Sequence, residues 1–128
     1  MEYGSKWIPT EIRQKTEERT VVISFNNGDT FEYSMEFLRV FCPCAECMGH
    51  HPSQAKLIYG KRSVQIEKMT PIGHYALKIN FDDSHGTGVY SWDTLFDLGK
   101  NQQQLWQEYL EELKQAGKSR TMIPIAIG

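Results

Sequence analysis

The chain has 128 residues, three of them cysteine, and a formal net charge of −2 at pH 7. That length corresponds to one ordinary domain with a core of its own. The near-neutral charge gives no general attraction for nucleic acid or anionic membranes, and no apolar leader or membrane-length run occurs. We therefore expect a single cytoplasmic domain over residues 1–128, with its core at about 7–117 and a tail at 118–128.

The first half of the chain contains a predicted β-hairpin followed by a short helix. Trp7 and the next two residues are expected to anchor an extended N-terminal arm to the core. Apolar side chains alternate at 21, 23 and 25 and again at 31 and 33, on either side of the turn sequence Asn26–Asp29. Ser34 is a predicted N-cap for a helix that runs to about Phe41. Pro43 ends that helix.

The second half of the chain predicts an antiparallel meander followed by two helices. Alternation at 64 and 66, at 75–81 and at 87–90 indicates strands, with turns at 71–73 and 82–86. Ser91 is a predicted N-cap for a helix over 92–98 that Gly99 closes, and Asn101 for one over 102–116 that Gly117 closes. The longer helix has an apolar stripe of Leu105, Trp106, Tyr109, Leu110 and Leu113. The predicted fold class is α+β, a small antiparallel sheet of hairpin and meander with helices on one side.

All three cysteines fall within six residues, Cys42-Pro43-Cys44-Ala45-Glu46-Cys47. Pro43 favours an extended conformation at Cys42, so Cys42 and Cys44 can face the same side. A helical turn from Cys44 brings Cys47 to that side as well. Three thiolates from one loop suit one soft metal ion, whereas a disulfide would leave one cysteine over. The alternative interpretation, three small buried apolar side chains, is disfavoured by this clustering.

A fourth ligand has to come from elsewhere, and four histidines compete for the role. His50 and His51 are near in sequence, but all four ligands would then come from one loop, whereas structural zinc sites more often join separated elements. His74 and His85 lie at predicted strand ends, where a side chain can reach a neighbouring loop. The residues alone rank His85 ahead of the others by a small margin.

The chain resembles the N-terminal domain of gamma-butyrobetaine hydroxylase and its trimethyllysine relative, and the stand-alone bacterial form of that domain (DUF971). The resemblance spans about residues 7–117 and is carried by residues 37–39, 42–47, 71–76, 81–85, 87–92 and 95. It implies a zinc ion held by three cysteines and one histidine, here Cys42, Cys44, Cys47 and His85. Many bacterial members have serine or valine at the cysteine positions. Because this chain has the cysteines, the resemblance implies that it is one of the metal-binding members. Some fusion partners of such domains resemble P-loop iron–sulfur cluster carriers.

Several classes of function follow from these features. Oxygenase activity is not expected, because a non-haem iron site needs two histidines and a carboxylate, and no His-x-Asp or His-x-Glu occurs. We expect a non-catalytic zinc-binding module that interacts with a protein partner, which could be a second copy of the chain. The alternative is an accessory factor in iron–sulfur cluster assembly or carriage, with iron or a cluster at the same ligands. The metal loop through Ser53 and the apolar tail 122–127 are the two candidate interaction surfaces, the loop being preferred.

Overall fold

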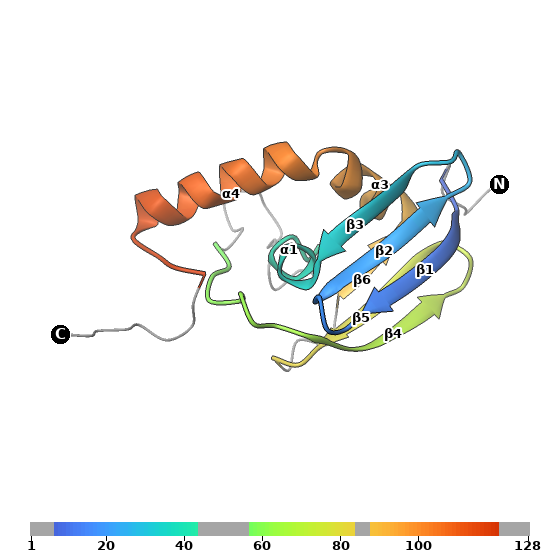
Figure 1. The fold of residues 1–128 in the computed structure, drawn as a ribbon, viewed down its shortest axis with the longest axis horizontal. Helices are drawn as coiled ribbons and strands as arrows, with labels where there is room; N and C mark the ends of the chain where they lie inside the picture. The colour runs from blue at the N-terminus through green and yellow to red at the C-terminus, as the bar shows by residue number, and fades with distance from the viewer. Residues whose placement is uncertain (1–6, 44–56, 84–87, 121–128) are drawn as a thin grey trace.

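The computed structural model describes residues 7–43, 57–83 and 88–120, and it has an α+β fold. Within these ranges, six strands form two antiparallel sheets of three strands each, ordered β1-β2-β3 and β4-β5-β6 (Figure 1). The predicted fold class is confirmed. The hairpin and the meander, however, belong to two separate sheets, where the sequence had suggested one. Within the described ranges, no helix has both the length and the apolar character needed to cross a membrane.

The first sheet contains the predicted hairpin, with β2 at Thr20–Phe25 and β3 at Thr30–Ser34. Its register pairs position 23 with 31 and 21 with 33, so the alternating apolar residues lie on one face. The prediction had an extended N-terminal arm but did not assign it to a sheet, whereas β1 at Pro9–Lys15 pairs along β2. This strand was missed because its side chains are mostly polar, with only Ile12 as an apolar member of the alternation. The predicted anchor is confirmed for Trp7, whose ring stacks on Phe96 with centroids 4.2 Å apart.

The second sheet is the predicted meander, with β4 at Ile66–Ile72, β5 at Ala76–Phe81 and β6 at Gly88–Ser91. Two of its boundaries differ from the prediction. Pro71 lies within β4, which is tolerated because β4 is an edge strand. The turn follows at Gly73, whose φ of 53° favours glycine, so the sequence pattern placed it two residues too early.

Three helices complete the described fold: α1 at Met35–Val40, α3 at Trp92–Lys100 and α4 at Gln102–Ala116. The predicted N-caps of α1 and α3 are confirmed, because the hydroxyls of Ser34 and Ser91 accept backbone N–H bonds within their helices. Two expectations are corrected. Gly99 lies inside α3 and does not end it. Asn101 makes no side-chain cap for α4, and its amide instead donates to the carbonyl of Asp97 at the end of α3.

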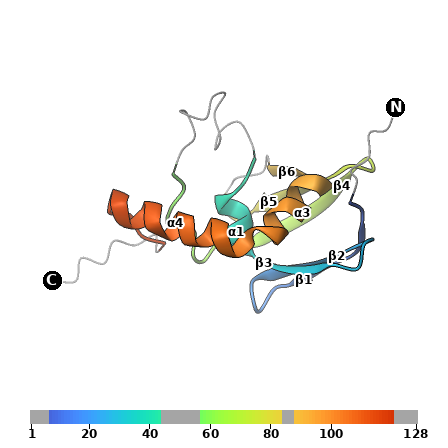
Figure 2. The same ribbon diagram turned by 90° about the horizontal axis from the view of Figure 1, so that it is seen from above.

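The core lies between the inner faces of the two sheets and the buried sides of the helices. The two sheets form distinct layers in Figure 2, and α3 contacts both β3 and β6, so it bridges the layers on one side. Fully buried side chains come from both sheets, from α1 and the residues just after it, and from α3: Val21, Ile23, Tyr33, Met35, Leu38, Cys42, Ile79, Tyr90 and Leu95. Helix α3 therefore packs against both sheets, where the sequence had suggested that the helices cover one face of a single sheet.

Tyr109 joins α4 to the segment that precedes β4. Its hydroxyl donates to the carbonyl of Ile58 at 2.7 Å, and its ring packs on Trp106 with centroids 5.0 Å apart. Burial, together with the carboxylate of Glu36, raises the pKa of Tyr109 to about 12. The predicted apolar stripe of α4 is confirmed here, because Tyr109 and Leu113 are its two buried members.

This raised pKa predicts alkaline sensitivity. A phenol whose pKa is raised on folding stabilises the protein fully below its unfolded pKa of about 10, and this contribution is lost as pH rises through the folded value. Tyr109→Phe should be less stable than wild type at pH 7 by about 1 kcal/mol, from the lost hydrogen bond. In urea unfolding followed up to pH 12, the difference in the free energy of unfolding between wild type and Tyr109→Phe should become smaller as the pH rises. Parallel stability curves would contradict this assignment.

Candidate metal centre

The first predicted ligand, Cys42, follows directly after a short, buried helix. Every residue of α1 is buried, although the helix includes the charged side chains of Glu36 and Arg39. The Cys42 N–H donates to the Arg39 carbonyl at 3.3 Å, so the chain leaves the helix through a tight turn. Cys42 is fully buried. Its position is therefore fixed by the packing of α1 and by the local backbone.

The sulfur of Cys42 lies against the first residue of β6. A Cβ atom added to Gly88 would come within 3.2 Å of Cys42 Sγ and within 3.0 Å of a Tyr90 ring carbon. Tyr90 in turn donates its hydroxyl to the carbonyl of Leu38 in α1. The start of β6 and the end of α1 are thus in direct contact, and glycine at position 88 allows this close approach.

A second contact joins the end of α1 to the residues that follow β5. Arg39 Nε lies 2.8 Å from Asp83 Oδ2, and Lys61 Nζ lies 2.7 Å from the same oxygen. The Arg39 side chain is 8% exposed and those of Lys61 and Asp83 are each 16% exposed, so the cluster is shielded from water. Burial opposes ionisation of Asp83, but the hydrogen bonds and charges of Lys61 and Arg39 outweigh it and lower the pKa of the carboxyl.

These contacts have a consequence for the choice among the histidines. Asp83 and Gly88 flank residues 84–87, and each contacts the end of α1, through Arg39 and Cys42 respectively. One flank of the segment that contains His85 is therefore at Cys42 and the other at Arg39, three residues before it. His74 precedes β5, and six strand residues separate it from this end, or roughly 20 Å at the usual rise per residue. The fold thus disfavours His74 as a ligand that completes the cysteine loop.

The other predicted ligands, Cys44, Cys47 and His85, lie outside the described residues, as do the competing His50 and His51. Among the residues that are described, no group of three or more His, Cys, Asp or Glu side chains could hold a metal ion. The four-ligand set therefore stays a prediction. Burial of Cys42 by itself fits a metal ligand and a packed thiol equally well; its contact with Gly88 is the more informative observation.

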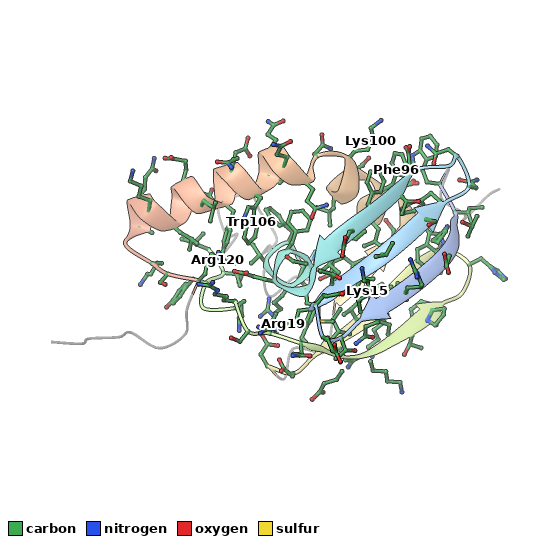
Figure 3. The ribbon with its side chains drawn as sticks, viewed as in Figure 1. Lys15, Arg19, Phe96, Lys100, Trp106 and Arg120 are labelled. Carbon is green, nitrogen blue, oxygen red and sulfur yellow. The ribbon has the colours of Figure 1, made fainter. Side chains whose placement is uncertain are left out.

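Sequence reasoning missed the two ion pairs of α1. Besides Arg39 with Asp83, Glu36 receives two hydrogen bonds from Arg120, at 2.9 and 2.7 Å. Arg120 also lies over the ring of Trp106, 5.3 Å from its centroid, and Figure 3 shows the two side chains close together between α4 and the segment that follows it. The available signal was two charges in the otherwise apolar sequence MEFLRV. The partners, 44 and 84 residues away, could not be read from it.

Comparison with known proteins places this architecture in a family. The family model for "gamma-butyrobetaine hydroxylase-like, N-terminal" matches residues 12–96. The chain belongs to this family. Its residues 12–96 include Cys42, both ion-pair partners in α1 and the whole of residues 81–91, so the predicted family resemblance is confirmed.

Solved structures of relatives agree with this assignment. The chain is 34% identical to a DUF971-family protein of unknown function from Acidithiobacillus ferrooxidans ATCC 23270, known from a 1.93 Å crystal structure; the match covers 71% of this chain and 91% of that one, with a TM-score of 0.61. Two NMR solution structures are 41% and 39% identical, with TM-scores of 0.79 and 0.80. They cover 100% and 94% of this chain and 96% and 95% of their own. No curated protein matches the chain.

Proposed function

We propose that this protein is a non-catalytic, zinc-stabilised binding module, with Cys42, Cys44, Cys47 and His85 as the four zinc ligands. The observation that supports the proposal best is the contact of the Cys42 sulfur with Gly88, three residues after His85. The Arg39–Asp83 ion pair supports it independently, from the other side of His85. Two elements separated in sequence would then be joined by one ion, which is the usual arrangement of structural zinc sites.

A Cys3His zinc centre is tetrahedral and coordinatively closed, so zinc would supply structural stabilisation. In this proposal, the protein itself positions the ligands. Cys42 is held by α1 and Gly88, which lowers the conformational cost of assembling the remaining ligands. Thiolate ligands need a reducing compartment, which agrees with the proposed cytoplasmic location.

The binding role rests on the loop that follows Cys47. A metal ion that fixes the backbone of this loop would reduce the ordering cost of docking on a protein partner. The loop residues Met48, His50 and His51 and the tail 121–128 lie outside the described residues. Alanine substitutions at Met48, His50 and His51 that weaken capture of a partner, with unchanged metal content, would support the loop as the interaction surface.

The ligand assignment predicts one zinc ion per chain. Elemental analysis of the purified protein should give a 1:1 ratio of zinc to chain. His85→Ala should lower zinc affinity by more than about 100-fold, because loss of a direct ligand costs more than loss of an outer-shell partner, which costs about 10–100-fold. His74→Ala is a matched control, because His74 lies at the opposite end of β5. Retention of full affinity in His85→Ala together with its loss in His50→Ala or His51→Ala would overturn the assignment.

The same measurement separates zinc from the iron–sulfur alternative. Thiolates bind both zinc and iron–sulfur clusters. A colourless protein with stoichiometric zinc would support the structural role. A brown protein with visible absorbance and stoichiometric iron would instead support an accessory role in iron–sulfur metabolism.

A further inference from the structure

Strand β1 is an edge strand with an open outer side. Among the described residues it pairs only with β2, at one edge of the first sheet (Figure 1). Pro9 and a bulge interrupt its first residues, but the pairing from Glu11 to Lys15 is regular. The neighbouring edge strand of the second sheet, β4, contains Pro71, which cannot donate to an added strand. Unpaired backbone groups on an edge strand can pair with another chain, so β1 is the better of these two edges for strand addition.

The hydrogen bonds of β2 show which backbone groups of β1 point outward. The N–H and the carbonyl of Phe25 both bond to residues of the turn that leads into β3. Because successive residues of a strand direct these groups to opposite sides, the preceding residue, Ser24, directs its own toward β1. Ser24 is opposite Glu11, so Glu11 bonds to β2. The N–H and the carbonyl of the next residue, Ile12, therefore point away from β2 and are available to another strand.

The residues on either side of Ile12 carry opposite charges. Ile12 packs against the core, so its neighbours Glu11 and Arg13 lie on the outer face of the sheet. Their side chains are 59% and 62% exposed, and Arg13 Nε is 3.8 Å from Glu11 Oε2 in the same strand. If a second, antiparallel copy of β1 had its Ile12 opposite Ile12, each Glu11 would be opposite Arg13 of the other copy. Opposite charges in directly opposed positions stabilise a pair of strands, and like charges destabilise it.

One register satisfies both the backbone and the charges. Residues whose backbone groups point outward must face one another, so two antiparallel copies of β1 can slide past each other only by two residues at a time. A slide in one direction would place Glu11 opposite Glu11 of the second copy. A slide in the other direction would place Arg13 opposite Arg13 of the second copy. Both slides bring like charges together, so the sequence Glu11-Ile12-Arg13 selects the register centred on Ile12.

Apolar surface lies beside this edge as well. A groove of about 480 Å³ lies between β1 and β4, and Ile8, Ile12 and Pro71 are among its apolar lining residues. Ile8 is 48% exposed. Gln14 Nε2 donates to the carbonyl of Ile66 at 3.1 Å, which holds β1 next to β4. Directly opposed side chains point to the same face, so Ile12 of a second copy would lie beside Ile12, at this groove. Pairing would therefore also remove apolar surface of both copies from water.

We propose that the protein forms a homodimer in which the β1 strands of two copies pair antiparallel about a two-fold axis at Ile12. The first sheets of the two copies then form one continuous sheet. The occupant of the β1 edge is a second copy of this chain because the edge is complementary to itself, as a two-fold interface requires. The dimer goes beyond the proposed binding module and does not depend on the zinc site.

Sedimentation equilibrium of the full-length protein, from about 10 µM to about 1 mM, tests the dimer. The mass of the wild type should rise with concentration from 14.8 kDa toward twice that value. Glu11→Arg and Arg13→Glu should each weaken dimerisation by about tenfold or more, because each places like charges at both ends of the strand pair. Lys114→Glu is the matched control: it changes the net charge as Arg13→Glu does, but on an exposed residue of α4, and should leave dimerisation unchanged.

A mixture of the two β1 variants tests the register. When Glu11→Arg is mixed with Arg13→Glu, every opposed pair again has opposite charges, so a heterodimer should form although neither variant dimerises well alone. A wild type that is monomeric over the whole range overturns the second copy as occupant of the edge. A dimer that persists equally in both variants overturns β1 as the interface. Variants that are monomeric alone and fail to pair in the mixture overturn the register centred on Ile12.

Discussion

Chelation of zinc from the metal-loaded protein should lower its melting temperature substantially and leave both sheets formed. Structural zinc contributes about 10–16 kcal/mol of apparent binding free energy in small peptides, while whole domains are stable by only about 5–15 kcal/mol. Metal loss should therefore have a large effect. The two sheets nevertheless share a buried core in which Cys42 is the only cysteine among the described residues, so most of that core does not depend on the ion.

Hydrogen exchange with and without a chelator would measure this effect residue by residue. Amides of β2 and β5, the central strands of their sheets, should stay protected. Amides from Phe41 to His51 and around His85 should lose protection. Cys42→Ser provides the control, because a protein that has lost a zinc ligand should respond little to the chelator. Complete unfolding of the metal-free protein at room temperature would contradict the prediction, and so would an unchanged melting temperature.

Gly99→Ala should destabilise the fold, although alanine normally stabilises a helix interior relative to glycine by about 1 kcal/mol. A Cβ atom at position 99 would lie 2.5 Å from Phe31 Cγ and 2.8 Å from the Tyr33 hydroxyl oxygen. Phe31 Cγ can move away only if the ring rotates about χ1 into its packed neighbours or if β3 shifts. Overpacking of this kind costs about 1–3 kcal/mol and occasionally more, which exceeds the gain in helix propensity.

A double-mutant cycle would test this cause. In urea unfolding, Gly99→Ala should lower the free energy of unfolding by less in a Phe31→Ala background than in wild type. The reason is that Phe31→Ala removes the closest contacts of the added Cβ atom. Gly117→Ala is a useful comparison: nothing lies within 4 Å of the added Cβ, but its φ of 69° penalises alanine through the backbone alone. If Gly99→Ala lowered the free energy of unfolding equally in both backgrounds, crowding against Phe31 would not be the cause of the destabilisation.

Sequence patterns predicted the elements that are determined by residues close together in the sequence. The hairpin followed from strict alternation around Asn26–Asp29, and the caps Ser34 and Ser91 followed from their position before helical sequence. Polar β1 carried little such signal, and its strand conformation comes from pairing with β2. Gly99 was misread as a helix end, because the close approach of β3 that requires glycine there is a tertiary contact.

The candidate site was predictable only in part, for the same reason. The spacing of the cysteines indicates a metal loop, but spacing cannot decide which distant histidine completes it. That choice depends on which strand ends meet the end of α1. The contacts of Asp83 with Arg39 and of Gly88 with Cys42 supply this information, and both join residues more than 40 positions apart.

The pairing of Glu36 with Arg120 affects the order in which the molecule can form during synthesis. The two residues are 84 positions apart, so Glu36 leaves the ribosome long before its partner exists. At about 5–20 residues per second, the delay is roughly 4 to 17 s. Throughout that interval, burial of α1 would leave the Glu36 carboxylate without its guanidinium, which is costly in an apolar interior. The helix that leads into the cysteines can therefore reach its final environment only after Arg120 has been synthesised.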